Sequence, residues 1–354
     1  VALQQEAIVG DGNGWESAMV PGPVVGDGRL FAMDATGHIS AHEAMQVGTQ
    51  LWESDAAVEK ESPPILGGGL AYSQGRLFVT TGYGKVLALD AKNGTLLWQE
   101  AVNIPLRAAP RVHGRRVFAL SADNQLFAFS AVNGTLLWTH RGISETAGIL
   151  APVMPTASED VVVAPYSSGT LHGIDAIRGV ELWSDTLSLT RRTQAGAVLA
   201  GIGGNPVVAN GVVFDASNNG FMAASLLRNG RRLWEQTISA GSTPWLAGQF
   251  IYVLSPDYTL ACLRAVDGAV KWVKPLPAYA DMEAKDEPLH WHSPVLAGGK
   301  LYVTGTHGVL QRIAPESGAV EDALPIPDGV YASPIVANGR LYLVDRNARL
   351  HVYY

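Results

Sequence analysis

One β-rich pattern recurs eight times along the 354-residue chain, and repetition at this spacing restricts the fold more than any other feature. The clearest copy, residues 64–98, reads PILGGGLAYSQGRLFVTTGYGKVLALDAKNGTLLW. Each copy opens with a proline, and successive prolines are on average about 44 residues apart, within the ~40–50 residues of a four-stranded propeller blade. The opening prolines are Pro23, Pro64, Pro110, Pro152, Pro206, Pro244, Pro294 and Pro334.

A short run rich in β-branched and aromatic residues follows a turn residue in each copy and predicts the second strand of each blade. These runs are GRLFA (28–32), GRLFV (75–79), RRVFAL (115–120), DVVVA (160–164), NGVVF (210–214), FIYVL (250–254), KLYVT (300–304) and GRLYL (339–343). The repeat therefore predicts an all-β chain. We expect residues 1–354 to form a single eight-bladed β-propeller of four-stranded antiparallel blades.

The predicted third strands align when they are anchored on the glycine four residues before the closing tryptophan. One column then holds Ser40, Val86, Leu126, Leu171, Met222, Leu260, Leu310 and Leu350, which are apolar in seven of eight blades. Two residues on, the same face holds His42, Ala88, Ala128, Gly173, Ala224, Cys262, Arg312 and Val352. Small residues there allow a close approach by the neighbouring blade. This position predicts that Cys262, the one cysteine, is a buried filler and not a reactive thiol.

Tryptophan closes six of the copies and predicts a packing device. The column consists of Trp52, Trp98, Trp138, Trp183, Trp234 and Trp272, whereas blade seven has Asp322. A buried tryptophan removes ~150–250 Å² from water, a gross ~4–6 kcal/mol each. The same residue at one position of six blades indicates packing and not a series of binding sites.

The eighth copy stops after its third predicted strand, and the N-terminus offers the missing one. Residues 3–9, LQQEAIV, resemble the outer-strand segments WQEAV (98–102) and WEQTI (234–238). An unpaired strand edge invites aggregation. We therefore expect residues 2–9 to complete blade eight and close the ring, with Leu3 in the tryptophan column.

Composition excludes several classes of function. The net charge of −7 argues against a nucleic-acid binder, and no run of eighteen apolar residues predicts a membrane helix. No spacing of Ser, His and Asp indicates a catalytic set. The glycine-rich GIGGNP (201–206) precedes no predicted helix, so it indicates a turn and not a phosphate-binding loop.

Two long segments between blades, residues 184–205 and 273–293, are the places where function is expected, because long loops on a rigid scaffold commonly carry it. The first contains Leu187, Leu189, Arg191 and Arg192. Leucines beside arginines are typical of a protein-binding hot spot. The alternative is a solvated loop whose leucines pack against the blade.

The second segment contains His290 and His292 among four acidic residues. Imidazole and carboxylate groups suit Zn²⁺, but the spacing fixes no third ligand. An acidic solvated loop is the favoured interpretation. We expect no metal and no cofactor.

The motif ALDAKNGTLLW (88–98) resembles the tryptophan-docking repeat of quinoprotein-type propellers. Within that superfamily, the number of units, the length and the N-terminal strand are similar to the BamB family of outer-membrane assembly lipoproteins over nearly the whole chain. The resemblance implies a non-catalytic periplasmic scaffold. It also implies attachment to the inner leaflet of the outer membrane by an N-terminal lipid anchor that this sequence does not include.

In that family, a Leu-Ser-Leu-Arg-like stretch after blade four helps to bind a periplasmic POTRA domain of BamA, the barrel-inserting subunit. LSLTR (187–191) matches this stretch with one additional residue, Thr190. The family's acidic pair before the next blade has no counterpart in ISAGSTP (238–244). The resemblance also implies contact with nascent outer-membrane proteins.

Two alternatives stay open. A pyrroloquinoline quinone (PQQ) dehydrogenase would share the repeat, but such enzymes are longer, often have an adjacent cysteine pair, and need Ca²⁺ ligands near the axis. This chain has one cysteine, and its predicted inner strands, such as PVVANG (206–211), contain little that would hold an ion. The other alternative is a periplasmic propeller that binds a different protein or a glycan.

Overall fold

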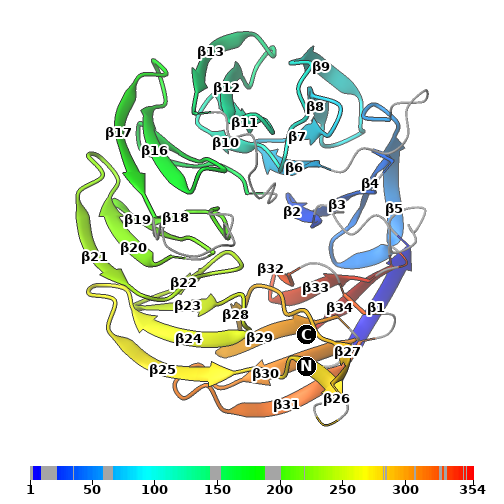
Figure 1. Ribbon diagram of the computed structural model, residues 1–354. Coiled ribbons are helices and arrows are strands. Elements are labelled where there is room, and N and C mark those ends of the chain that lie inside the picture. Colours follow the sequence, from blue (N-terminus) through cyan, green and yellow to red (C-terminus); the bar gives the residue numbers. More distant parts are fainter. Residues whose placement is uncertain are drawn as a thin grey trace.

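The computed structural model describes residues 3–8, 22–34, 36–58, 67–143, 153–187, 201–218, 220–281, 283, 285–306, 308–326, 329–330, 333–345, 347 and 349–354. Their regular secondary structure consists of β-strands, arranged as eight four-stranded antiparallel sheets around a central axis (Figure 1). The predicted eight-bladed propeller is therefore confirmed.

The strands of blades one to four, from the inner to the outer strand, are β2 (Val24–Gly26), β3 (Arg29–Met33), β4 (Ile39–Glu43) and β5 (Gln46–Ser54); β6 (Gly68–Ser73), β7 (Arg76–Thr81), β8 (Lys85–Asp90) and β9 (Leu96–Ala101); β10 (Arg111–His113), β11 (Arg116–Leu120), β12 (Gln125–Ser130) and β13 (Leu136–Arg141); and β14 (Thr156–Ser158), β15 (Val161–Pro165), β16 (Thr170–Asp175) and β17 (Glu181–Thr186).

The strands of blades five to eight are β18 (Val207–Ala209), β19 (Val212–Ala216), β20 (Met222–Leu226) and β21 (Arg232–Gln236); β22 (Trp245–Ala247), β23 (Phe250–Leu254), β24 (Thr259–Arg264) and β25 (Val270–Pro275); β28 (Val295–Ala297), β29 (Lys300–Gly305), β30 (Val309–Ile313) and β31 (Val320–Pro325); and β32 (Ile335–Ala337), β33 (Arg340–Val344), β34 (Arg349–Tyr353) and β1 (Leu3–Ile8). A separate hairpin of β26 (Tyr279–Asp281) and β27 (Asp286–Pro288) lies between blades six and seven.

The hydrophobic core is divided among the junctions between neighbouring blades. At the first junction, Phe31, Ile39 and Trp52 of blade one lie in one buried cluster with Leu77 and Leu87 of blade two. Equivalent clusters occupy the other seven junctions, including the one between blades eight and one. Each blade is thus held by burial against both neighbours.

Each closing tryptophan contacts the hairpin of the next blade. Trp52 donates its indole N–H to the carbonyl of Ala91 at 3.0 Å, and its ring lies against Gly94. Gly94 has φ +74°, and a Cβ there would lie 2.6 Å from the Trp52 ring, so only glycine satisfies both the turn and the contact. The same hydrogen bond recurs for the other five tryptophans, to the carbonyls of Ala131, Ala176, Leu227, Ala265 and Pro315. The packing role predicted for this column is confirmed.

The predicted register of blade one is wrong by one residue. Trp52 pairs with Ala41, just as Trp98 pairs with Ala88, and Ile39 fills the apolar column that Ser40 was expected to fill. His42 pairs instead with Gln50. The β4–β5 pair contains two irregularities, so counting back from the glycine before Trp52 misses the register.

Blade eight is closed by β1, which pairs antiparallel with β34 (Figure 1), as the sequence predicted. The expectation for Leu3 is wrong: Leu3 pairs with Tyr353 and is exposed, whereas Gln5 pairs with Val352 in the tryptophan position. The Gln5 amide donates to the carbonyl of Met45 at 2.9 Å and accepts from the N–H of Val47 at 2.9 Å. Gln5 therefore docks blade eight onto the hairpin of blade one.

Asp322 stands in the tryptophan position of blade seven for a reason that the topology supplies. The outer two strands of blade eight, β34 and β1, pair without a connecting hairpin, so no hairpin glycine is there to receive an indole ring. Asp322 instead pairs with Arg312 of its own blade, with Oδ2 3.6 Å from the guanidinium.

Among the described residues, no helix has the length and apolar character needed to cross a membrane.

Candidate functional site

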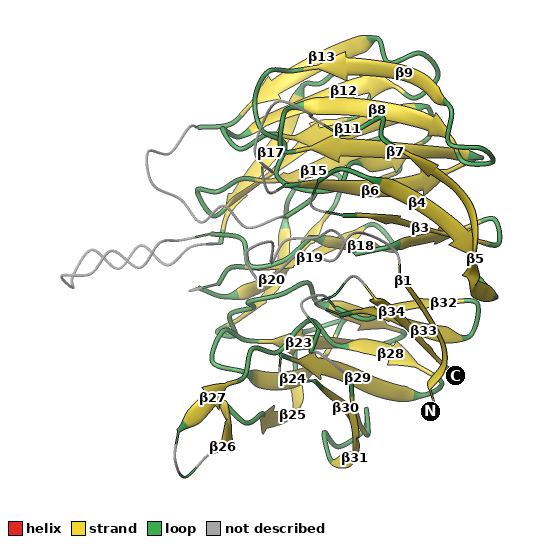
Figure 2. Ribbon diagram, turned by 90° about the vertical axis from the view of Figure 1, so that its right-hand side faces the viewer, coloured by secondary structure: helices red, strands yellow, loops and turns green. Residues whose placement is uncertain are grey.

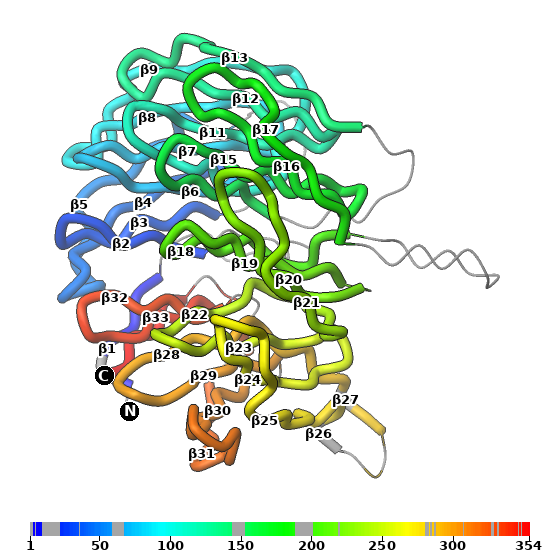
Figure 3. The backbone as a smooth tube through the Cα atoms, turned by 90° about the vertical axis from the view of Figure 1, so that its left-hand side faces the viewer, coloured from blue at the N-terminus to red at the C-terminus, as the bar shows by residue number. Residues whose placement is uncertain are grey.

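The connections from the outer strand of one blade to the inner strand of the next leave from one face of the ring. The turns between second and third strands lie on the same face, because the strands of each blade run in alternating directions. The β26–β27 hairpin projects from this face (Figures 2 and 3), and Leu187 and Ile202, which belong to the other long segment, lie on it at the turn that contains Ser217. The described parts of the two long segments thus lie on one face.

Of the predicted partner-binding residues, the structure describes Leu187, whereas Leu189, Arg191 and Arg192 lie outside the described residues. Leu187 is 1% exposed and belongs to the core cluster between blades four and five, with Trp183 and Ile202. Its side chain therefore anchors the start of the loop. The partner contact itself stays a prediction.

Both described ends of this loop meet at one turn of blade five. The Ser217 hydroxyl donates to the carbonyl of Leu187 at 2.9 Å, and the backbone of Ser217 bridges to Ile202. The N–H of Gly201 donates to the Asn218 side chain at 3.0 Å. Gly220 allows this close approach, because a Cβ there would lie 2.3 Å from the Leu187 carbonyl oxygen. Leu187 and Gly201, the described residues on either side of this segment, thus share a fixed base.

A charged clamp holds the blade-four side of that base. Arg232 of β21 binds Asp185 of β17 through two nitrogens, at 2.5 and 3.3 Å, and donates to the carbonyl of Thr186 at 3.3 Å. Its guanidinium lies 4.6 Å above the Phe221 ring. Partial burial alone would lower the pKa of Arg232, but hydrogen bonds to Glu235 and Asp185 raise it above its ordinary value. The guanidinium of Arg232 is therefore protonated throughout the physiological pH range.

The segment at 238–244, where the family's acidic pair was sought, packs against the other side of the base. The N–H of Asn205 donates to the Thr243 hydroxyl at 3.0 Å, and the N–H of Ala240 donates to the carbonyl of Ser217 at 2.9 Å. A Cβ on Gly203 would lie 1.7 Å from the Ala240 carbonyl oxygen. The two segments that the resemblance links are therefore in contact, although the second carries no acidic side chain.

The histidines of the second long segment have separate partners. His290 Nδ1 lies 2.6 Å from the Tyr258 hydroxyl of blade six, whereas His292 Nε2 lies 3.0 Å from the carbonyl of Val330. The buried Trp291 stands between them and donates to the carbonyl of Pro277 at 2.7 Å. These contacts do not bring the two imidazoles to one point.

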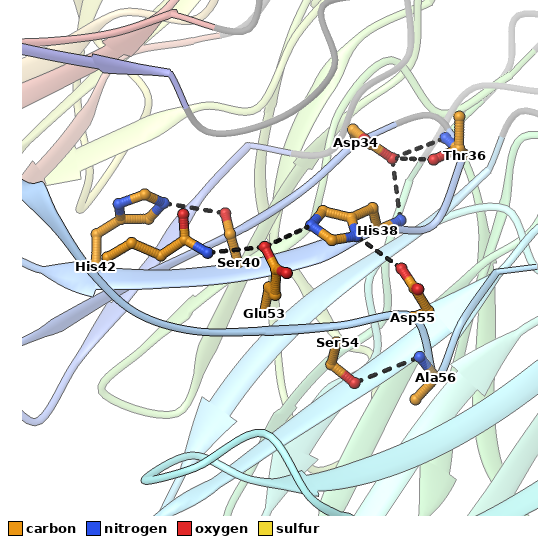
Figure 4. Close-up of polar contacts among 10 residues, drawn as sticks. Asp34, Thr36, His38, Ser40, His42, Glu53, Ser54, Asp55 and Ala56 are labelled. Atoms are coloured by element: carbon orange, nitrogen blue, oxygen red, sulfur yellow. Dashed lines mark hydrogen bonds and ion pairs between the residues drawn. The ribbon is translucent and has the colours of Figure 1, made fainter.

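A polar network lies on the same face of blade one (Figure 4). Asp34 accepts from the N–H groups of Thr36 and His38 at 2.9 and 3.0 Å, and His38 Nδ1 lies 2.7 Å from Asp55. Partial burial alone would lower the pKa of His38, but the hydrogen bond to Asp55 and the charges of Asp34 and Glu53 raise it above 6.5. This part of the face carries a titratable group.

Sequence reasoning missed the groups that fix the loop and one further cluster. Asp185 and Arg232 are 47 positions apart, so no local pattern pairs them. His140, His172 and Glu181 come together between blades three and four. No sequence signal marked His172, because its third-strand position holds Leu87, Phe127, Ala223 and Ala261 in four blades but Ser40, Gln311 and His351 in the other three.

The tryptophan-docked ring places the chain in a class, the eight-bladed propellers with quinoprotein-type repeats. The family model described as "Outer membrane protein assembly factor BamB" matches residues 35–274. The chain therefore belongs to the BamB family. Outer membrane protein assembly factor BamB of Escherichia coli K12 is 28% identical over 337 residues, covering 93% of this chain and 83% of that protein.

Solved structures agree on the fold. BamB from Moraxella catarrhalis superposes with a TM-score of 0.83 at 17% identity, covering 99% of this chain and 98% of that one. Quinohemoprotein alcohol dehydrogenase from Comamonas testosteroni gives a TM-score of 0.71 at 12% identity, covering 99% of this chain and 76% of that one. At these identities the likeness concerns the fold alone, so function rests on the family and on the site.

Proposed function

We propose that this chain is a non-catalytic scaffold subunit of the outer-membrane β-barrel assembly machinery. It docks onto a periplasmic POTRA domain of BamA through inter-blade loops, with residues 184–205 as the principal contact. The protein lies in the periplasm and is held at the inner leaflet of the outer membrane by an N-terminal lipid anchor. Its exposed loops also contact nascent outer-membrane proteins.

The fixed base of the loop is the observation that carries this proposal. Ser217 receives both ends, and Arg232 clamps Asp185 beside the first of them. A loop whose ends are fixed loses less conformational entropy on binding than one with free ends. With Leu187 buried as an anchor, Leu189, Arg191 and Arg192 are the residues of the loop assigned to the partner.

The decisive experiment measures the affinity of the full chain for the periplasmic region of BamA. We expect the double variant Leu189→Ala and Arg191→Glu to bind about 30-fold more weakly, a loss of about 2 kcal/mol, because truncating one anchor and reversing one charge removes hot-spot contacts. Isothermal titration calorimetry gives the dissociation constants.

A matched control separates this site from a general effect of charge. Leu97 and Arg115 are exposed on blades two and three, which do not contribute to the base of the loop. The variant Leu97→Ala with Arg115→Glu should bind BamA like the wild type. An unchanged affinity in the loop variant, or an equal loss in the control, would contradict the assignment of the loop.

The dehydrogenase alternative has its own test. Adding PQQ with Ca²⁺ to the protein should leave the absorbance spectrum of the quinone unchanged, because the proposed function needs no cofactor. A saturable spectral shift at one equivalent would instead support a quinoprotein enzyme.

A further inference from the structure

Two histidines and a glutamate converge at the junction between blades three and four. His140 lies on β13, the outer strand of blade three, whereas His172 and Glu181 lie on β16 and β17 of blade four, the next blade in the ring (Figure 1). His140 Nε2 is 3.3 Å from Glu181 Oε2, and His172 Nδ1 is 2.9 Å from the same oxygen. Three potential ligand atoms thus face one point.

The repeat itself explains why these side chains meet. Trp138 of β13 packs on Gly179 of blade four, as every closing tryptophan packs on the next hairpin. His140 follows Trp138 by two residues, so alternation keeps it on the surface that faces blade four. The irregularity in the β16–β17 pair places Glu181 opposite Ile174, which lies in the buried cluster between blades three and four. The rigid junction between the blades therefore positions both side chains.

The remaining nitrogen of each imidazole is held by a hydroxyl group. His140 Nδ1 lies 2.7 Å from the hydroxyl of the fully buried Tyr166, and His172 Nε2 lies 3.2 Å from the Thr170 hydroxyl. A hydroxyl can accept an imidazole N–H, which leaves the other nitrogen free to donate its lone pair to a metal. Metal-binding histidines usually donate this N–H to a carboxylate, a backbone carbonyl or water, and here the two hydroxyl groups take that place.

Tyr166 is itself fixed in place. Its ring is parallel to that of His140 at 6.1 Å and tilted against that of His172 at 4.8 Å. Gly142 makes room for it, since a Cβ there would lie 2.6 Å from the tyrosine ring. Both histidines are therefore oriented before any ligand arrives.

We propose that His140, His172 and Glu181 bind a zinc ion across the junction between blades three and four. The ligand atoms lie within 4.8 Å of one another. In a tetrahedral site with ligands at about 2.0–2.2 Å, neighbouring ligand atoms are roughly 3.3–3.6 Å apart. Small side-chain rotations therefore complete the coordination, and a water molecule takes the fourth position, as in other sites with two histidines and one glutamate.

The ligand set also selects the metal. Two imidazoles favour Zn²⁺ over Mg²⁺ and Ca²⁺, which prefer oxygen ligands. The side chains of His140 and His172 are 13% and 14% exposed and that of Glu181 is 41% exposed, so an ion can enter from solvent. A bound ion would join two blades and raise the thermal stability of the ring.

The test uses the full chain without an affinity tag. After equilibration with Zn²⁺ and removal of excess metal, we expect about one zinc per chain and a rise in Tm that Mg²⁺ and Ca²⁺ do not produce. His172→Gln and Glu181→Gln should each weaken zinc binding at least ~10-fold and abolish the zinc-dependent rise in Tm. Tyr166→Phe keeps all three ligands and should weaken binding by about 10–100-fold.

Two controls make the assignment specific. His113→Gln removes a histidine of blade three that contacts the carbonyl of Glu159, and His290→Gln with His292→Gln removes the other histidine pair. Both variants should bind zinc like the wild type. No retained zinc in the wild type, equal zinc in His172→Gln and Glu181→Gln, or loss of zinc in either control would overturn the proposal.

One measurement on the wild type does not depend on variants that fold correctly. The X-ray absorption spectrum of the zinc-loaded protein should show nitrogen and oxygen ligands at about 2.0–2.1 Å with the scattering of two imidazoles. A spectrum with no imidazole scattering would reject the site.

Discussion

At the scale of single residues, the charge around His38 makes a prediction about pH. Its imidazole lies 2.7 Å from Asp55, with Asp34 and Glu53 close by (Figure 4). The pKa of His38 is raised above 6.5, so protonated His38 favours the folded state. This contribution is fully present below about pH 6.5 and is lost as the pH rises through the raised pKa. It is of the order of 0.2–1 kcal/mol, because Asp55 and Glu53 are 65% exposed.

Nuclear magnetic resonance titration of the His38 ring measures this directly. We expect a midpoint above 6.5 in the wild type and a lower midpoint in Asp55→Asn, which keeps the side-chain shape and removes the charge. His38→Gln assigns the signal. A wild-type midpoint at or below 6.5 would show that burial outweighs the carboxylates.

Single residues also show which sequence patterns are informative. Cys262 was predicted to be a small buried filler, and it is 2% exposed with its pKa raised by burial to about 11. That inference succeeded because Cys262 shares a column with Ala88 and Ala128, and these small residues indicate that the position is buried and closely packed. His140 shares its outer-strand position with polar residues such as Glu100 and Asp185, and His172 shares its position with Ser40 and His351, so neither column sets these histidines apart.

At the scale of elements, β1 docks onto blade one through Gln5. This residue stands in the tryptophan position and makes hydrogen bonds where an indole ring would pack. Gln5 buries less apolar area than an indole ring, but it makes two hydrogen bonds to the hairpin of blade one. Gln5→Ala should lower the free energy of unfolding by about 1–3 kcal/mol, because the Val47 N–H loses its partner, whereas the Met45 carbonyl still accepts from Arg340 at 2.9 Å. Urea denaturation measures the loss.

The control for that element is Gln99→Ala on β9, which is exposed and should change stability by less than about 0.5 kcal/mol. Equal stability of Gln5→Ala and the wild type would mean that strand pairing with β34 alone closes the ring.

The sequence predicted β1 from its likeness to outer strands. It missed Gln5, because Leu3 pairs with Tyr353 and not with Val352, and the irregularity between Leu3 and Gln5 adds one further residue before the docking position.

At the scale of the whole molecule, the ring was predictable because six of the junctions between blades repeat the same contact between a tryptophan and a hairpin glycine. Six tryptophans with their hairpin glycines mark the junctions in the sequence. The base of the long loop was not predictable, since Asp185, Arg232 and Ser217 are brought together only by the packing of blades four and five. Membership of the family does not by itself establish which protein this chain binds. The proposed contact with BamA rests on the loop at 184–205, so it is the claim that most needs measurement.

Hydrogen–deuterium exchange of the full chain, alone and bound to the periplasmic region of BamA, tests that claim most directly. Amides of residues 184–205 and of the turn at 217–220 should exchange more slowly in the complex. Hairpin turns of the opposite face, such as residues 91–95, should be unchanged. Protection of the opposite face, with residues 184–205 exchanging equally fast in both states, would contradict the proposed docking.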